Sequence, residues 1–363
     1  MHLGIYYLLL SVIPSGGLAA AHVGGPQGGR TVGCTSSTFN PSKGDQFKCT
    51  LAGDWPPSSF LVVRDADWRP IRSLTLSRKG SAAYSVTWDG KDSAGMIVPD
   101  EAYTIAIMDR VRNRVLYDPA TISGGEFGDV ERIEVDRTRG TLSYSLSAPS
   151  RVLFRAGFKS ADHLKTVVNL EPRPSGRIVE YWNGKDESGL VNLLGAPNCY
   201  LVISYYELPQ NSVIAYGNRT LEYASYRPKP LSLTVPLPAI TPSARRVSPL
   251  FLQRRSRARD FRLELLVDAE SPPAPKAVVN ARQGSLLRVS TNEATRKLLD
   301  GRQFEIMFYF DHQFFAESER GYLPFNMPLD TGTLTPGEHL LTVNITTYDG
   351  LSGLVSRKVR VEK

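Results

Sequence analysis

Trp88-Asp89-Gly90-Lys91-Asp92-Ser93-Ala94-Gly95 is a motif that occurs twice in this chain, the second time as Trp182-Asn183-Gly184-Lys185-Asp186-Glu187-Ser188-Gly189. The two tryptophans are 94 residues apart. That spacing is close to the length of one β-sandwich domain of about 100 residues. The repeat therefore predicts a duplicated β-domain. We call the two copies the first and second motif loops.

The residues on both sides of each motif loop alternate between apolar and polar types, as half-buried strands do. These segments are Ala83–Trp88 and Ala102–Met108 around the first copy, and Ile178–Trp182 and Tyr200–Tyr205 around the second. Asp-Gly or Asn-Gly then reverses the chain, because glycine accepts a positive φ and the Asx side chain can bond to its own backbone. The tryptophan at the strand end is expected to anchor the core. The predicted structural residues of the motif are Trp88, Asp89, Gly90, Gly95, Trp182, Asn183, Gly184 and Gly189.

The pattern W-[DN]-G-K-D-x-[AS]-G resembles the FlgD Ig-like module, a family named after the flagellar hook-capping protein and common in secreted bacterial proteins. The first copy also carries the family's upstream segment Phe39–Gly44, the strand Phe60–Asp65 and the downstream Val98-Pro99. The second copy keeps Val152–Arg155 but has a longer insert, Leu190–Asn198. The resemblance implies two immunoglobulin-like domains, at 32–125 and 128–225. It also implies assembly or scaffold roles, which some relatives have.

The last hundred residues form a third strand-rich unit, predicted at 260–363. Four segments in it are similar to the bacterial Ig-like pattern: Phe308–Asp311, Leu329–Thr331, Leu334–Val343 and Tyr348–Gly350. The longest helix candidate in the chain, Thr291–Leu299, makes only one or two turns. The predicted fold class is therefore all-β, with tandem immunoglobulin-like β-sandwiches.

The N-terminal apolar run, Ile5–Ile13, is too short to span a bilayer. It is followed by Ala19-Ala20-Ala21, which is typical of a cleavage site, so residues 1–21 are predicted to be a secretory signal peptide. An n-region lysine or arginine is missing. A lipoprotein is the alternative, since Thr31–Cys34 resembles a lipobox, although it lies too far beyond the run. The mature chain is expected outside the cytoplasm (secreted, periplasmic or at the cell surface) without a transmembrane segment.

The chain has three cysteines. Cys34 and Cys49 flank a short segment, and disulfides persist in exported proteins, so this pair is expected to be bridged. A bridge across such a loop stabilises by about 3 kcal/mol. Cys199 lies in a predicted strand and is expected to be a free thiol that packs as a small hydrophobe.

Residues 226–259 are predicted to be an extended linker, because proline recurs in them. An arginine tract follows these prolines. It contributes seven positive charges against Asp260 alone, so it accounts for six of the formal net charge of +7. Arginine clusters attract phosphates and carboxylates, so acidic glycans and anionic lipid headgroups are candidate partners, and a solvated linker is the alternative. Nucleic acid is not expected, because no recognition motif occurs. The candidate polyanion-binding residues are Arg245, Arg246, Arg254, Arg255, Arg257 and Arg259.

The sequence contains no pattern of catalytic or metal-ligating residues. His22, His163, His312 and His339 are not spaced as ligands, and His339 is expected to be a satisfied strand histidine. The acids of the motif loops lack the register of a calcium loop, so they are expected to stabilise turns. No nucleophile elbow, phosphate loop or dinucleotide fingerprint occurs. The chain is therefore predicted to be a non-enzyme without metal or cofactor.

Two functions remain. The first is an exported structural, adhesive or assembly scaffold at the cell surface, which binds a protein partner. The second is a carbohydrate-binding accessory protein for acidic polysaccharide or cell-envelope glycans. The second depends on aromatic residues near the end of the second domain, which either stack on sugars or simply build a sheet. These residues are Tyr205, Tyr206, Tyr216, Tyr223 and Tyr226.

Overall fold

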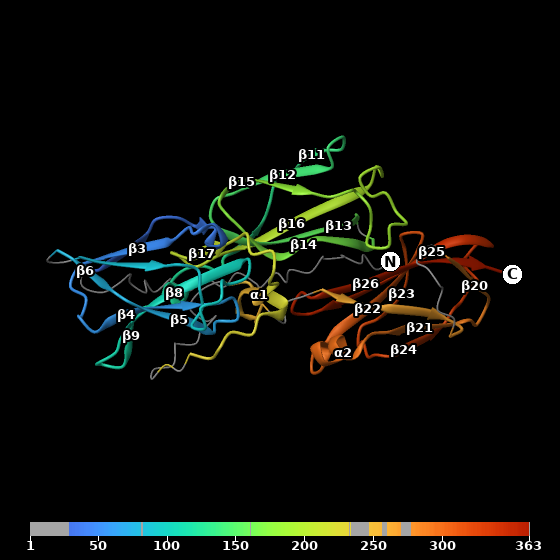
Figure 1. Cartoon of the computed structure of the whole chain (residues 1–363). Coiled ribbons are helices and arrows are strands. Elements are labelled where there is room, and N and C mark those ends of the chain that lie inside the picture. The colour runs from blue at the N-terminus through green and yellow to red at the C-terminus, as the bar shows by residue number, and fades with distance from the viewer. Residues whose placement is uncertain are drawn as a thin grey trace, which may run out of the picture.

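The computed structural model describes residues 29–80, 83–159, 161–231, 233, 247–255, 260–269 and 277–362. The predicted signal peptide, 1–21, lies outside these residues. The described chain is almost entirely β-structure in six sheets, which confirms the all-β prediction. Figure 1 shows three strand-rich bodies: a blue one at the N-terminal side, a green one in the middle and an orange-red one at the C-terminal side. We call them the first, second and third sandwiches.

The first sandwich packs an antiparallel sheet against a mixed sheet, in which β17 and β2 are parallel, around a core that contains Leu51, Trp55 and Trp88. One sheet has the order β1 (Thr31–Cys34), β3 (Phe47–Ala52), β7 (Ala83–Trp88), β6 (Ser77–Lys79). The other has the order β2 (Thr38–Phe39), β17 (Val213–Ala215), β8 (Glu101–Asp109), β4 (Ser59–Arg64), β5 (Pro70–Thr75), and β9 (Arg114–Tyr117) also pairs with β8. Burial in β3 alternates strictly, as the period of two requires, whereas every residue of β8 is buried.

The second sandwich repeats this plan. Its sheets have the orders β10 (Phe127–Asp129), β16 (Cys199–Glu207), β13 (Ser150–Phe158), β14 (His163–Arg173) and β11 (Glu134–Asp136), β12 (Thr141–Leu146), β15 (Gly176–Tyr181). The order β16-β13-β14 matches β8-β4-β5, and β11-β12-β15 matches β1-β3-β7. The described residues contain no counterpart of β6, so β15 is an edge strand.

The third sandwich has one sheet with the order β18 (Phe261–Arg262), β26 (Ser352–Val361), β25 (Gly337–Thr347), β22 (Phe304–Phe310), β23 (Gln313–Ser318), and β20 (Val278–Ala281) also pairs with β26. Its second sheet is β19 (Glu264–Val267), β21 (Leu286–Ser290), β24 (Phe325–Pro328). The predicted short helix is present as α2 (Glu293–Leu299), and Asn292 caps it by accepting a hydrogen bond from the backbone N–H of Thr295.

The chain crosses between sandwiches in a way that the sequence did not indicate. Residues 213–215 lie within the predicted limits of the second domain, 128–225, yet β17 pairs with β2 and β8 of the first sandwich. The described chain also has three short 3-10 helices: η1 (Pro41–Lys43), η2 (Pro119–Thr121) and η3 (Tyr223–Ser225), the last of which follows β17. The chain thus returns to the first sandwich after completing the second.

The predicted linker, 226–259, also departs from a purely extended segment. It contains the helix α1 (Pro249–Leu252), capped by Ser248, and Leu250 and Phe251 are buried. Figure 1 shows α1 in the middle of the molecule, where the three bodies meet. Phe251 packs edge-on against Trp68 of the first sandwich and Tyr206 of the second, with ring centroids 5.5 and 5.6 Å apart. The linker therefore supplies the apolar centre of the junction.

Candidate functional site

The two motif loops have the same hydrogen bonds at equivalent positions. The Trp88 indole N–H donates to the carbonyl of Lys91 at 2.8 Å, and that of Trp182 donates to Lys185 at 2.9 Å. Asp89 and Asn183 each accept the backbone N–H two residues ahead. The glycines that follow have φ of 74° and 75°, which L side chains rarely adopt. The repeat in the sequence is therefore also a repeat in three dimensions.

The second acid of each motif loop is buried and turns inward. Asp92 is fully buried, and its Oδ1 accepts the backbone N–H groups of Ala94 and Met96. Asp186 is 4% exposed and accepts those of Ser188 and Val191. These carboxylates close the turns, as we predicted. Among the described residues, no group of three or more His, Cys, Asp and Glu side chains is arranged to hold a metal ion.

The two copies differ in the side-chain hydroxyl that donates to the buried carboxylate. In the second motif loop the hydroxyl of Ser188 donates to Asp186. The first loop has Ala94 at that position, and the hydroxyl of Tyr226 donates to Asp92 Oδ2 at 3.0 Å instead. Tyr226 is 1% exposed and follows η3. The first motif loop is therefore the point at which the linker attaches to the first sandwich.

The structure also tests the predictions for the three cysteines and for His339. Cys34 and Cys49 form a disulfide across β1 and β3, as predicted. Cys199 is free and half-buried, and burial raises the pKa of its thiol. His339 bonds to Asp311 and to the carbonyl of Thr335, both at 2.6 Å, so it is a satisfied strand histidine.

Two of the six candidate polyanion-binding arginines lie within the described residues. Arg245, Arg246, Arg257 and Arg259 lie outside the described residues. Arg254 is exposed. Arg255 is a correction to the polyanion prediction, because its side chain is only 15% exposed and its Nε lies 3.3 Å from Glu101 Oε2. It is an internal partner of a carboxylate rather than a surface cation.

Glu101 is the centre of the junction between the first and second sandwiches. It begins β8 and is 2% exposed. Its Oε1 lies 2.6 Å from Nη1 of Arg151, which belongs to β13. Burial disfavours charge on Arg151, but the attraction of Glu101 outweighs it and raises the pKa of the guanidinium above its ordinary value. One buried carboxylate thus binds one arginine from the second sandwich and one from the linker.

A second polar network joins the second and third sandwiches. Asp260 accepts from Nη2 of Arg155 at 3.1 Å and from the backbone N–H of Ser352 at 3.1 Å. The side-chain amide of Asn344 and the backbone of His163 exchange two hydrogen bonds of 2.8 Å. Burial, reinforced by the nearby charge of Arg155, lowers the pKa of His163 to about 4. These contacts fix the second sandwich to the strands β25 and β26.

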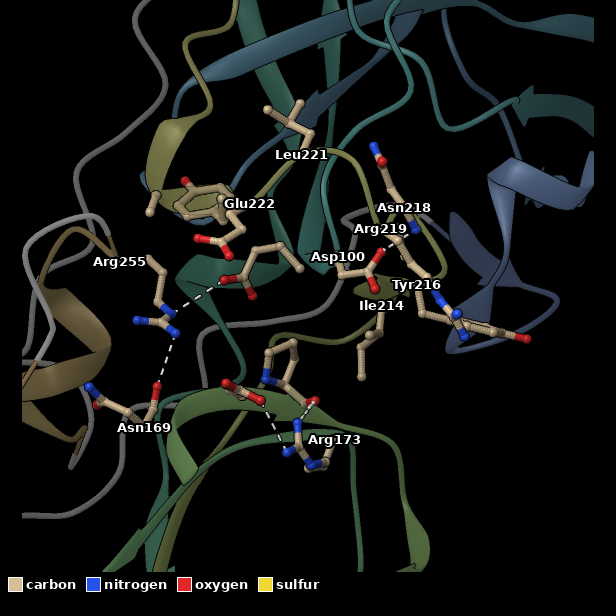
Figure 2. A pocket seen from close by; sticks show the side chains of 16 residues that line it. Asp100, Asn169, Arg173, Ile214, Tyr216, Asn218, Arg219, Leu221, Glu222 and Arg255 are labelled. Carbon is tan, nitrogen blue, oxygen red and sulfur yellow. Dashed lines mark hydrogen bonds and ion pairs between the residues drawn. The ribbon is translucent and has the colours of Figure 1, made fainter. Parts of the chain in front are cut away.

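A cavity of about 670 Å³ lies beside Glu101. It is bounded by the start of β8, the end of β14 and the segment 214–224. In Figure 2, Tyr216 and Arg219 lie on one side of it and Arg255 on the opposite side. Arg255 also donates to the carbonyl of Asn169 at 2.9 Å. The cavity is therefore part of the junction and is lined by both acids and arginines.

The five tyrosines of the sugar hypothesis do not form one surface. Tyr206 and Tyr226 are buried at 6% and 1% exposure, and both have structural contacts. Tyr205 and Tyr223 are half-buried. Tyr216 is 47% exposed and lines the cavity. Most of this aromatic group therefore builds the sheets and the junction.

Glu101, Arg151 and the role of Tyr226 were not predicted from the sequence. Glu101 and Arg151 each stand at the start of a strand, where a charged residue is ordinarily solvated. No local pattern marks them as partners. The one available signal was the substitution of Ala94 for the serine of the second motif loop, which removes a hydroxyl that the buried acid needs.

The fold and the junction define the class: a protein of tandem immunoglobulin-like β-sandwiches. No family model and no curated protein matches the chain. The solved structures to which it is similar include the following three, each with a low TM-score. The endo-β-1,4-mannanase of Thermotoga petrophila is 14% identical over 31% of this chain and 22% of that chain, with a TM-score of 0.21. The fibronectin(III)-like modules of CbhA from Clostridium thermocellum are 10% identical over 92% of this chain and 94% of that chain, with a TM-score of 0.19. A tetra-tandem repeat from the extending region of a large adhesion protein is 12% identical over 91% of this chain and 74% of that chain, with a TM-score of 0.18.

At such TM-scores these similarities do not support a fold assignment, so the class is assigned from the observed sheets alone. This chain spans less than a quarter of the mannanase. The more specific FlgD Ig-like assignment stays a prediction. Within the described ranges, no helix has the length and apolar character needed to cross a membrane.

Proposed function

We propose that this chain is a non-enzymatic structural protein that works outside the cytoplasm, as a rigid spacer or assembly scaffold that presents its sandwiches to a protein partner. The observation that supports the proposal is the junction. Isolated sandwiches on a flexible tether would not need a buried carboxylate that binds arginines from two other segments. The Cys34–Cys49 disulfide supports the proposed location, because disulfides persist in oxidising compartments.

Rigidity follows from the physical cost of separating the sandwiches. Opening the junction would expose Phe251 and Tyr206 to water and leave Glu101 without its partners. A buried charge that loses its partner is destabilised by several kcal/mol. The three domains are thus expected to move as one body. Their proposed limits are 32–125 with the added strand 213–215, 128–212, and 260–363.

The test uses the tagged full chain in the cells that produce it. Intact cells are treated with a membrane-impermeant crosslinker and with external protease, and the variant Glu101→Gln is compared with the parent. We expect protease sensitivity on intact cells and one reproducible crosslinked protein, with a lower yield for the variant. A cytoplasmic protein with reduced Cys34 and Cys49, or a free monomer in the medium, would refute the proposal.

A carbohydrate-binding accessory role is the second candidate, and the exposure of Tyr216 at the cavity favours it. An exposed tyrosine ring can pack against the apolar face of a sugar. Binding to a glycan array that is lost in Tyr216→Ala but kept in Tyr322→Ala, an exposed tyrosine of the third sandwich, would support this role. Absence of binding to every glycan would exclude it.

A further inference from the structure

Among the described strands, β15 is an edge strand, whereas the equivalent strand of the first sandwich, β7, has a neighbour on both sides. In the first sandwich, β7 pairs on one side with β3 and on the other with β6, through Ser77↔Ser85 and Lys79↔Ala83. In the second sandwich, β12 is the only strand of the described residues that pairs with β15. The internal repeat therefore shows what can cover this edge, namely an antiparallel extended strand.

Four other edge strands, β5, β6, β11 and β14, carry features that discourage pairing with another chain. β5 and β14 each contain a proline, Pro70 and Pro172, and each pairs with its neighbour through at least one register shift. β6 is three residues long with Arg78 and Lys79 exposed, and β11 is three residues long with two acids. Prolines, bulges, charges and short length are the usual protections of an edge.

β15 has none of the backbone protections. It is a regular six-residue strand, Gly176-Arg177-Ile178-Val179-Glu180-Tyr181, that pairs with β12 in unbroken register. Its outward side chains include Val179 at 46% and Tyr181 at 80% exposure. A shallow groove beside it is lined by Lys165–Val167 of β14 and by Tyr181–Asn183. Apolar residues on an unprotected edge are the combination that promotes strand addition.

The outward face of β15 is complementary to itself. When two copies align antiparallel about Val179, Val179 stands opposite its own counterpart, and Arg177 stands opposite Tyr181 of the second copy. Opposed apolar pairs and cation–aromatic pairs stabilise antiparallel strands. Arg177 is 65% exposed, and its contact with Glu134 is a surface ion pair that costs little to rearrange.

We propose that two copies of this chain associate through their β15 strands, which form a continuous antiparallel sheet across a two-fold axis. This inference goes beyond the scaffold function and does not depend on it, since association is measured on the purified chain. Only five residues, Arg177–Tyr181, pair on each side, so the interface is small and we expect weak association, with a dissociation constant of about 10 µM to 1 mM. A two-fold contact of this kind joins two copies and then closes.

Sedimentation velocity on the purified mature chain, from about 5 µM to about 1 mM, measures the association. We expect a monomer–dimer equilibrium that Val179→Lys weakens at least tenfold, because it places two ammonium groups opposite each other. Val111→Lys is the matched control, since Val111 is 80% exposed in a turn and belongs to no edge strand. Far-ultraviolet circular dichroism checks that both variants are folded.

Crosslinking gives an independent readout of the register. In a Cys199→Ser background, Val179→Cys is expected to oxidise to a disulfide dimer, because directly opposed Cβ atoms lie about 4.5–5.5 Å apart. Val111→Cys is expected to stay monomeric. A chain that is monomeric throughout the concentration range, a dimer that Val179→Lys leaves intact, or equal dimer yields from the two cysteine variants would each overturn the proposal.

Discussion

Replacing Glu101 by glutamine is the sharpest perturbation of the junction. The change keeps the shape of the side chain but removes the charge that Arg151 and Arg255 face at 2.6 and 3.3 Å. Arg151 is 6% exposed, so its guanidinium would keep its charge without a carboxylate partner or bulk water, and among the described residues only the carbonyl of Leu170 would still accept from it. Breaking a buried ion pair from one side costs about 3–5 kcal/mol. We therefore expect Glu101→Gln to lower the free energy of unfolding by about that amount.

The control is Glu338→Gln, which removes an ion pair with Arg360 whose side chains are 45% and 52% exposed. A surface pair of this kind contributes at most about 1 kcal/mol. Urea unfolding is followed by tryptophan fluorescence, since Trp68 packs in the junction. Because three domains need not unfold together, the first transition is compared. A Glu101→Gln variant that loses no more stability than Glu338→Gln would refute the reasoning.

Three further predictions concern the motif loop, the linker and pH. Tyr226→Phe removes a hydrogen bond to a fully buried carboxylate and should lower the free energy of unfolding in urea by about 1–3 kcal/mol. Tyr223→Phe should be nearly neutral, because the Tyr223 hydroxyl has no hydrogen-bond partner among the described residues. Equal losses of stability in the two variants would contradict this prediction. Gly90→Ala should lower the midpoint of thermal unfolding more than Gly95→Ala. Both glycines have a positive φ, but only at Gly90 would an added Cβ clash with a neighbour, at 2.3 Å from Pro41. The reverse order of midpoints would contradict the turn geometry. The pKa of His163 is about 4 in the folded chain and 6.5 ordinarily, so between these pH values the unfolded chain binds more protons than the folded one. The contribution of His163 to the free energy of unfolding is therefore full above pH 6.5 and is lost on acidification towards pH 4, by at most about 3 kcal/mol. His163→Gln should reduce that slope, and an unchanged slope would show that other groups cause it.

The sequence predicted the elements that local patterns determine. The segment 83–88 is strand β7 with the predicted bounds, and the motif loops are turns, because alternation and Asx-Gly chemistry act within a few residues. The Cys34–Cys49 bridge was predicted from compartment and spacing and is present. Sequence reasoning is dependable where the physical cause lies close along the chain.

The junction was not predictable because its causes lie far apart in the sequence. β17 pairs Ile214 with Thr38 and Ala102, and a short apolar segment carries no signal about a partner so distant. Charge counts treated Arg255 as part of a basic surface, since the number of charges does not reveal burial. The site at Glu101 arises from tertiary packing of three segments, which one sequence does not show.

The central claim is that the three sandwiches form one rigid unit. Double electron–electron resonance on a Cys199→Ser chain, spin-labelled at Ser73→Cys on β5 and Ala294→Cys on α2, measures it directly, because both positions are exposed. We predict one narrow distance distribution, which broadens when Glu101→Gln is added. A broad distribution in the parent chain, unchanged by Glu101→Gln, would show independent domains and contradict the account.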